Sequence, residues 1–103
     1  MRAEVIFLGT SGGVPTPERG LPCVAVRYQG HLLLFDCGEG AQRQMMKAGL
    51  GFPANMKVFI THLHGDHIFG LPGLLQTMSL LGRREPLEVY GPPGISDYVN
   101  AIR

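Results

Sequence analysis

Three histidines and one aspartate lie within six residues of this sequence, in the order His62-x-His64-x-Asp66-His67. Imidazole and carboxylate are the ligands that catalytic Zn²⁺ prefers in proteins. On an extended or loop backbone His62 and His64 point to one side and can reach one ion, whereas the chain can turn after the flexible Gly65. Asp66 and His67 can then reach a second ion. The spacing of four such residues directly after an apolar strand predicts a two-metal site. The alternatives are a histidine-rich surface loop that binds nothing, and one or two imidazoles that only satisfy hydrogen bonds in the core.

The elements that must position this motif follow from the pattern of apolar residues and of glycine and proline. Runs of β-branched and aromatic residues predict strands, and good helix formers with apolar residues at helical spacing predict helices. Gln29 and Gly30 predict a hairpin turn, and Gly49 predicts a helix end. The motif is expected at the edge where a strand runs into a loop. The predicted strands are 4–8, 23–28, 31–36, 57–60 and 87–90, and the predicted helices are 41–48, 68–81 and 95–102.

Composition limits the classes of protein that remain. The chain has 103 residues, of which 45% are hydrophobic and 17% charged, as expected for one globular domain. A net charge of +1 gives no independent reason to expect nucleic acid as a partner. Cys23 and Cys37 form no metal-binding or disulfide pattern, which favours a reducing compartment. No signal peptide or apolar stretch long enough to span a membrane is recognisable, so we expect a cytoplasmic protein.

Several residues outside the motif are weaker candidates. Asp36 at the end of a predicted strand either supports the metal loop by orienting a ligand or is an ordinary turn aspartate. His31, beside the hairpin turn, is expected at the surface and not at the metal. Cys37 has no recognisable base and is expected to pack in the core. The glycine-rich stretch 9–13 lacks the Gly-Lys-Ser/Thr of a phosphate-binding loop and predicts a tight turn. The basic residues that could contact phosphates, although solvated charge is the simpler reading of each, are Arg19, Arg43, Lys47, Arg83 and Arg84.

The sequence resembles a known family at several stretches. The His-x-His-x-Asp-His pattern is the metal motif of the metallo-β-lactamase superfamily. Residues 7–16 (FLGTSGGVPT), 34–40 (LFDCGEG) and 70–75 (GLPGLL) are similar to the ribonuclease Z family in the same order. The departures are Ala41, where the resembling sequences often have Thr, and Gly20, where they often have Asn; neither is a predicted ligand.

The resemblance implies an α/β fold in which residues 1–103 form the N-terminal half of a metallo-β-lactamase αβ/βα four-layer sandwich. It implies that His62 and His64 hold one zinc ion and that Asp66 and His67 hold a second. Asp66 would also handle the proton of the attacking water. The implied function is that of a homodimeric, zinc-dependent endoribonuclease that removes the 3′ trailer from precursor tRNA by metal-activated attack of water on a phosphodiester.

The resemblance also predicts that this chain is incomplete. The family's site needs a further histidine, a bridging aspartate and a last histidine from later sequence, and no histidine follows His67 here. We therefore expect the 103 residues alone to be inactive and one face of the sheet to be uncovered, so that the isolated piece associates or is unstable. Two alternatives stay open: a hydrolase of the same superfamily that acts on another phosphodiester or ester, and a non-catalytic fragment that binds a partner.

Overall fold

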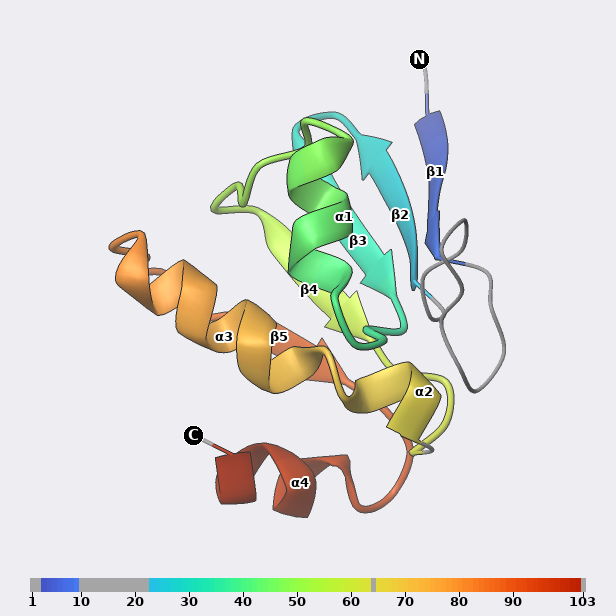
Figure 1. Cartoon of the computed structure of the whole chain (residues 1–103), viewed down its shortest axis with the longest axis vertical. Helices are drawn as coiled ribbons and strands as arrows, with labels where there is room; N and C mark the ends of the chain where they lie inside the picture. Colours follow the sequence, from blue (N-terminus) through green and yellow to red (C-terminus); the bar gives the residue numbers. More distant parts are fainter. Residues whose placement is uncertain (1–2, 10–22, 64, 103) are drawn as a thin grey trace.

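The computed structural model describes residues 3–9, 23–63 and 65–102, apart from the side chain of Asp66. Its centre is a five-stranded sheet in the order β1-β2-β3-β4-β5 (Figure 1). The first three strands pair antiparallel, and β3, β4 and β5 pair parallel. All five predicted strands are confirmed, each to within one residue at either end. They are β1 (Ala3–Gly9), β2 (Cys23–Tyr28), β3 (His31–Phe35), β4 (Met56–Phe59) and β5 (Glu88–Tyr90).

The predicted hairpin turn joins β2 to β3. Tyr28 pairs with His31, which leaves Gln29 and Gly30 as the two turn residues. Their φ angles are 50° and 81°, both in the left-handed region. A two-residue turn of this hand matches the right-handed twist of the flanking strands. The register of β3 is thereby set, and His31 lies exposed at its start as expected.

Helices connect the parallel strands, as parallel pairing requires. Helix α1 (Ala41–Lys47) follows β3, and α3 (Leu71–Leu80) lies between β4 and β5. α1 ends at the predicted place: Gly49, with φ 72°, donates its N–H to Met46 O at 3.1 Å. None of the helices in the described residues has the length and apolar character needed to cross a membrane.

The helix predicted at 68–81 is divided in the structure. A short helix α2 (Gly65–Ile68) comes first, and α3 begins only at Leu71, with Pro72 in its first turn. Proline suits a first helical turn, where its missing N–H has no partner to lose. The prediction of a helix packed against the sheet is confirmed, but its start was placed three residues too early.

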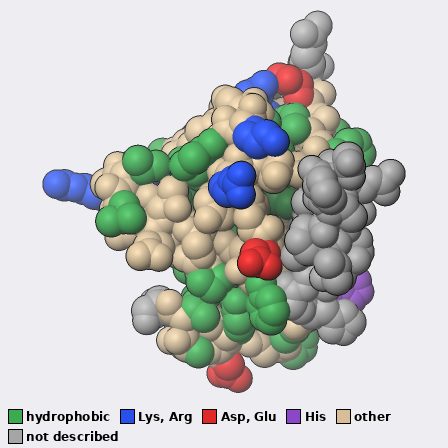
Figure 2. All heavy atoms as spheres, in the orientation of Figure 1, with side chains coloured by type: hydrophobic (Ala, Val, Ile, Leu, Met, Phe, Trp, Pro, Cys, Tyr) green, Lys and Arg blue, Asp and Glu red, His purple; other side chains and the backbone are tan. Residues whose placement is uncertain are grey.

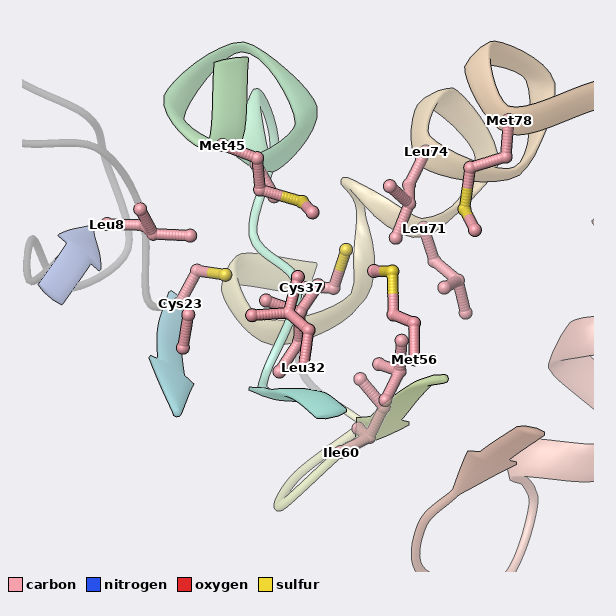
Figure 3. Close-up of a cluster of buried hydrophobic side chains, with 14 of the residues drawn as sticks. Leu8, Cys23, Leu32, Cys37, Met45, Met56, Ile60, Leu71, Leu74 and Met78 are labelled. Carbon is pink, nitrogen blue, oxygen red and sulfur yellow. The ribbon is translucent and has the colours of Figure 1, made fainter. Parts of the chain in front are cut away.

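The core lies between the sheet and the helices. One side chain in two along β3 and β4 points into it, including Leu32, Leu34 and Val58, each at most 1% exposed. Figure 3 shows Met45 of α1 and Leu74 of α3 facing this side of the sheet. The cluster is rich in sulfur, with Cys23, Cys37, Met45, Met56 and Met78 all buried. Methionine fills irregular gaps well, which suits a core bounded by short helices.

The last helix, α4 (Ile95–Ile102), packs on the rim of this core. It has no buried residue, and its Ile95, Tyr98, Val99 and Ile102 are partly covered. The Tyr98 hydroxyl donates to the carbonyl of Ile68 at 3.1 Å. This bond ties α4 to the end of α2, next to the predicted metal loop.

The other face of the sheet is apolar but carries none of the core cluster. A row of paired residues crosses all five strands there, from Phe7 through Val24, Phe35 and Phe59 to Tyr90. The rings of Phe35, Phe59 and Tyr90 stack in sequence with centroids 5.2 Å apart. Phe7 is 70% exposed. The expectation of an uncovered apolar face is confirmed for the described residues.

Candidate metal centre

The predicted metal motif lies at the carboxyl ends of the parallel strands. Asp36 directly follows β3, and Thr61 and His62 follow β4 after Ile60. In parallel sheets this edge is where the loops converge and ligands bind. Helix α2 lies at the same edge (Figure 1). The motif was expected on a loop, and this is corrected in part: Asp66 and His67 belong to α2, so a turn of helix follows Gly65.

Asp36 is the centre of the polar contacts at this edge. Asp36 is 8% exposed and has a φ of 67°, in the left-handed region that few residues other than glycine, asparagine and aspartate adopt. Its Oδ1 accepts the backbone N–H of Thr61 at 2.8 Å, and the Thr61 hydroxyl lies 2.8 Å from Oδ2. Oδ2 is also 3.0 Å from Nδ1 of His67. Of the two readings of Asp36, the structure favours the one in which it orients a histidine.

The structure brings two of the four predicted ligands together. The rings of His62 and His67 have centroids 5.0 Å apart and are tilted by 47°. His62 is exposed and His67 is partly covered. His64 and the side chain of Asp66 lie outside the described residues. Within the described part no group of three or more His, Cys, Asp and Glu is placed to hold a metal, so the four-residue ligand set stays a prediction.

Backbone contacts hold the two loops of the site against each other. Cys37 N–H donates to His67 O at 2.7 Å, and Gly70 N–H donates to Cys37 O at 2.8 Å. A Cβ at residue 70 would overlap the backbone carbonyl of Gly38, so only glycine fits there. Sequence reasoning missed Thr61 and Gly70 as parts of the site. For Thr61 the available signal was its position directly before the first histidine.

The cysteines take no part in this chemistry. Cys23 is 1% exposed, and burial first, with Asp36 nearby second, raises the pKa of its thiol to about 12. Burial is also the main cause that raises the pKa of the Cys37 thiol, followed by its neighbours Cys23 and Asp36. A thiol that stays protonated is a poor nucleophile and metal ligand. The prediction that Cys37 packs in the core is confirmed.

The basic candidates differ in their surroundings. The Arg83 guanidinium joins the segment after α3 to the loop before β4, so it is not free to contact a phosphate. It donates at 2.8 to 3.4 Å to the backbone carbonyls of Pro53, Ala54, Glu85 and Pro86. Arg84 is exposed. Figure 2 shows basic side chains over α1, the helix of Arg43 and Lys47. Hydrophobic side chains lie between this basic group and the far end of α3. Arg19 and residues 10–13 of the turn predicted over 9–13 lie outside the described residues.

These surroundings fit a zinc site in the chemistry of the donors. Two imidazole rings lie with their centroids 5.0 Å apart, and a carboxylate beside one of them occupies the position of an orienting group. Catalytic zinc sites combine histidine and carboxylate ligands in this manner. His31 is not part of the arrangement, because it begins β3 and the site lies beyond the end of that strand.

Comparisons with known proteins agree with this picture. A family model described as "Anti-Pycsar protein Apyc1" matches residues 3–99. Ribonuclease Z of Natronomonas pharaonis is 62% identical over 94 residues, which are 91% of this chain and 30% of the relative. The chain spans about a third of the length of the curated relatives it matches, which carry the name ribonuclease Z.

Solved structures show the same fold. Human tRNase Z, short form (ELAC1), is 50% identical, with a TM-score of 0.86 over 97% of this chain and 38% of the human one. The metallo-β-lactamase fold protein YhfI from Bacillus subtilis is 27% identical, with a TM-score of 0.75 over 95% of this chain and 42% of its own. The chain is therefore a homologue of ribonuclease Z with the metallo-β-lactamase fold, and it belongs to the family described as Anti-Pycsar protein Apyc1.

Proposed function

We propose that this chain is the N-terminal part, residues 1–103, of a zinc-dependent endoribonuclease that removes the 3′ trailer from precursor tRNA. The observation that carries the proposal is the meeting of His62 and His67, with Asp36 against His67, at the carboxyl ends of β3 and β4. The high identity to proteins named ribonuclease Z supports the choice of substrate. The remaining ligands would come from sequence outside these residues.

The residues of this chain would act mainly by holding and orienting. His62 and His64 would hold one zinc ion, and Asp66 and His67 a second. When bound, two zinc ions lower the pKa of a shared water and offset negative charge on a phosphodiester. Asp36 would keep the His67 ring in place, and Asp66 would take the proton of the attacking water. The proposal includes a homodimer in the cytoplasm, as for the family that the sequence resembles.

The test begins with the protein as it is expressed from its gene. We expect an intact mass above that of the 103 residues, stoichiometric zinc and cleavage of a precursor tRNA at its 3′ side. Asp66→Ala should abolish cleavage, and His62→Ala should lower both zinc content and cleavage. His31→Ala is the matched control, because it removes a histidine at the far end of β3 and should change neither. Equal zinc content and cleavage in His62→Ala and wild type would overturn the assignment.

A second candidate is a hydrolase of the same fold that acts on a small phosphodiester or another ester. It is favoured by the matching family model, because the description "Anti-Pycsar protein Apyc1" does not name a ribonuclease. Turnover of bis(p-nitrophenyl) phosphate without cleavage of precursor tRNA, again lost in Asp66→Ala, would select this candidate. If the intact protein had neither zinc nor turnover, the remaining alternative would be a non-catalytic fragment that only binds a partner.

A further inference from the structure

The contacts of Thr61 define which atoms carry hydrogens at the edge of the site. Its hydroxyl oxygen lies 2.8 Å from Asp36 Oδ2, 3.0 Å from Asp36 Oδ1 and 2.9 Å from Nδ1 of His62. Its backbone N–H is a separate donor to Asp36 Oδ1 at 2.8 Å. One side chain therefore links a buried carboxylate to an exposed imidazole.

The single hydroxyl hydrogen can serve only one of these neighbours. A carboxylate accepts hydrogen bonds and has none to donate, so two oxygens 2.8 Å apart need the hydroxyl hydrogen between them. Bonds to a charged acceptor are also the stronger ones. The Thr61 hydroxyl thus donates to Asp36 and turns a lone pair toward His62. For the 2.9 Å contact to be a hydrogen bond, Nδ1 of His62 must carry the hydrogen.

A neutral imidazole has one protonated nitrogen. With the hydrogen on Nδ1, the lone pair of His62 lies on Nε2, which is then the atom able to bind a metal. Oδ2 of the same carboxylate lies 3.0 Å from Nδ1 of His67. Asp36 can therefore bias the His62 ring through Thr61, and it lies beside the His67 ring.

We propose that Thr61 is a positioning residue of the metal site, whose hydroxyl relays Asp36 to His62 and holds His62 in the tautomer that presents Nε2 to the metal. The proposal rests on the proposed function for its purpose. The hydrogen bonds of Thr61 and the tautomer of His62 are properties of the metal-free protein and can be measured in it. Loss of an outer partner of this kind lowers metal affinity about 10- to 100-fold.

Thr61→Val tests the relay, because valine keeps the shape and the backbone N–H and replaces the hydroxyl with a methyl group that cannot form a hydrogen bond. The first readout is the nitrogen NMR spectrum of ¹⁵N-histidine-labelled, metal-free protein at pH 8, where an ordinary histidine is neutral. We expect wild-type His62 in one tautomer with an unprotonated Nε2, and a mixture in Thr61→Val. The second readout is zinc affinity by competition with a chelator, which should fall about 10-fold.

Two further variants separate the relay from a general effect of substitution. Thr61→Ser keeps the hydroxyl and should restore both readouts, and Thr77→Val makes the same change on α3 and should leave both at wild-type values. Thr61→Ala replaces Thr61→Val if the latter does not give a dispersed spectrum. An unchanged His62 tautomer in the folded variant would overturn the proposal, as would a wild-type protein with the hydrogen on Nε2. Absence of zinc binding in wild type would count against the proposed function alone, since the tautomer is read without metal.

Discussion

The two faces of the sheet are built from the same strands and are both apolar, yet they differ sharply in burial. On the helix-covered face Ala25, Leu34 and Val58 have no exposed surface. On the bare face Val5 is 57%, Phe7 70% and Tyr90 46% exposed. Alternate residues of one strand point to opposite faces, so this contrast arises within single strands. Apolar composition makes a face able to form a core, and only a covering layer makes it one.

The bare face differs from an ordinary solvent-exposed face in the regular alignment of its aromatic residues. Its aromatic row runs through aligned pairs on neighbouring strands, with stacked rings from β3 to β5. Beside the row, Lys57 and Glu88 form an exposed ion pair at 3.2 Å. A large ordered apolar patch with charge at its side is typical of an interface. The relatives are about three times as long as this chain, which leaves ample sequence to cover such a face.

The largest expected difference between the faces is in the cost of removing a leucine. Leu34→Ala on the covered face should lower the free energy of unfolding by about 2 to 5 kcal/mol, because it leaves a cavity in a packed core. Leu33→Ala, the adjacent residue on the bare face, should cost about 1 kcal/mol, since less surface is buried there. Urea unfolding at low protein concentration measures both. Equal losses would mean that the bare face is covered in solution.

The second prediction concerns association through the bare face. The 103-residue chain should sediment with an average mass that rises with concentration. Phe7→Ser should weaken this association about 10-fold or more, because burying a phenylalanine contributes about 1.5 to 3 kcal/mol. Leu80→Ser is the control, since Leu80 is 80% exposed but lies on α3. A larger effect of Leu80→Ser would move the interface to the helices.

A smaller effect is expected where the helical layer is fastened to the loop before β4. Arg83→Gln removes the guanidinium that bonds the carbonyls of Pro53 and Ala54, and should lower the free energy of unfolding by about 1 kcal/mol. Arg84→Gln changes the neighbouring exposed residue and should stay within about 0.5 kcal/mol of wild type. Thermal unfolding of the two variants side by side decides the point. Identical unfolding curves for the two variants would show that the hydrogen bonds of Arg83 contribute nothing to stability.

The smallest effect at neutral pH comes from the thiols of the covered face. The folded protein holds the pKa of Cys23 at about 12, above its ordinary value of 9.0. The unfolded chain loses this proton at the lower pH, so stability is complete below pH 9 and falls as the pH rises from 9 toward 12. Urea midpoints at pH 8 and pH 10.5 measure the loss, and Cys23→Ala should reduce it. A urea midpoint that does not change between pH 8 and pH 10.5 would contradict the raised pKa of the Cys23 thiol.

Much of the fold could be predicted from local sequence. Alternating apolar residues located the strands, Gln29-Gly30 located the hairpin, and Gly49 located the end of α1. The prediction was wrong at the start of α3, because the break at Gly70 depends on a close approach to Gly38 that is distant in sequence. Neighbouring residues hold no information about such a contact.

The sequence by itself determined which residues are able to bind a metal, because ligand type and spacing are local properties of His62, His64, Asp66 and His67. Only the tertiary structure decided how two of these residues are oriented. Asp36 lies 25 residues before Thr61, and it meets Thr61 and His67 because β3 and β4 are parallel neighbours. Burial was decided in the same way, since a strand alternates its side chains locally, but the layer that covers one face comes from elsewhere in the chain.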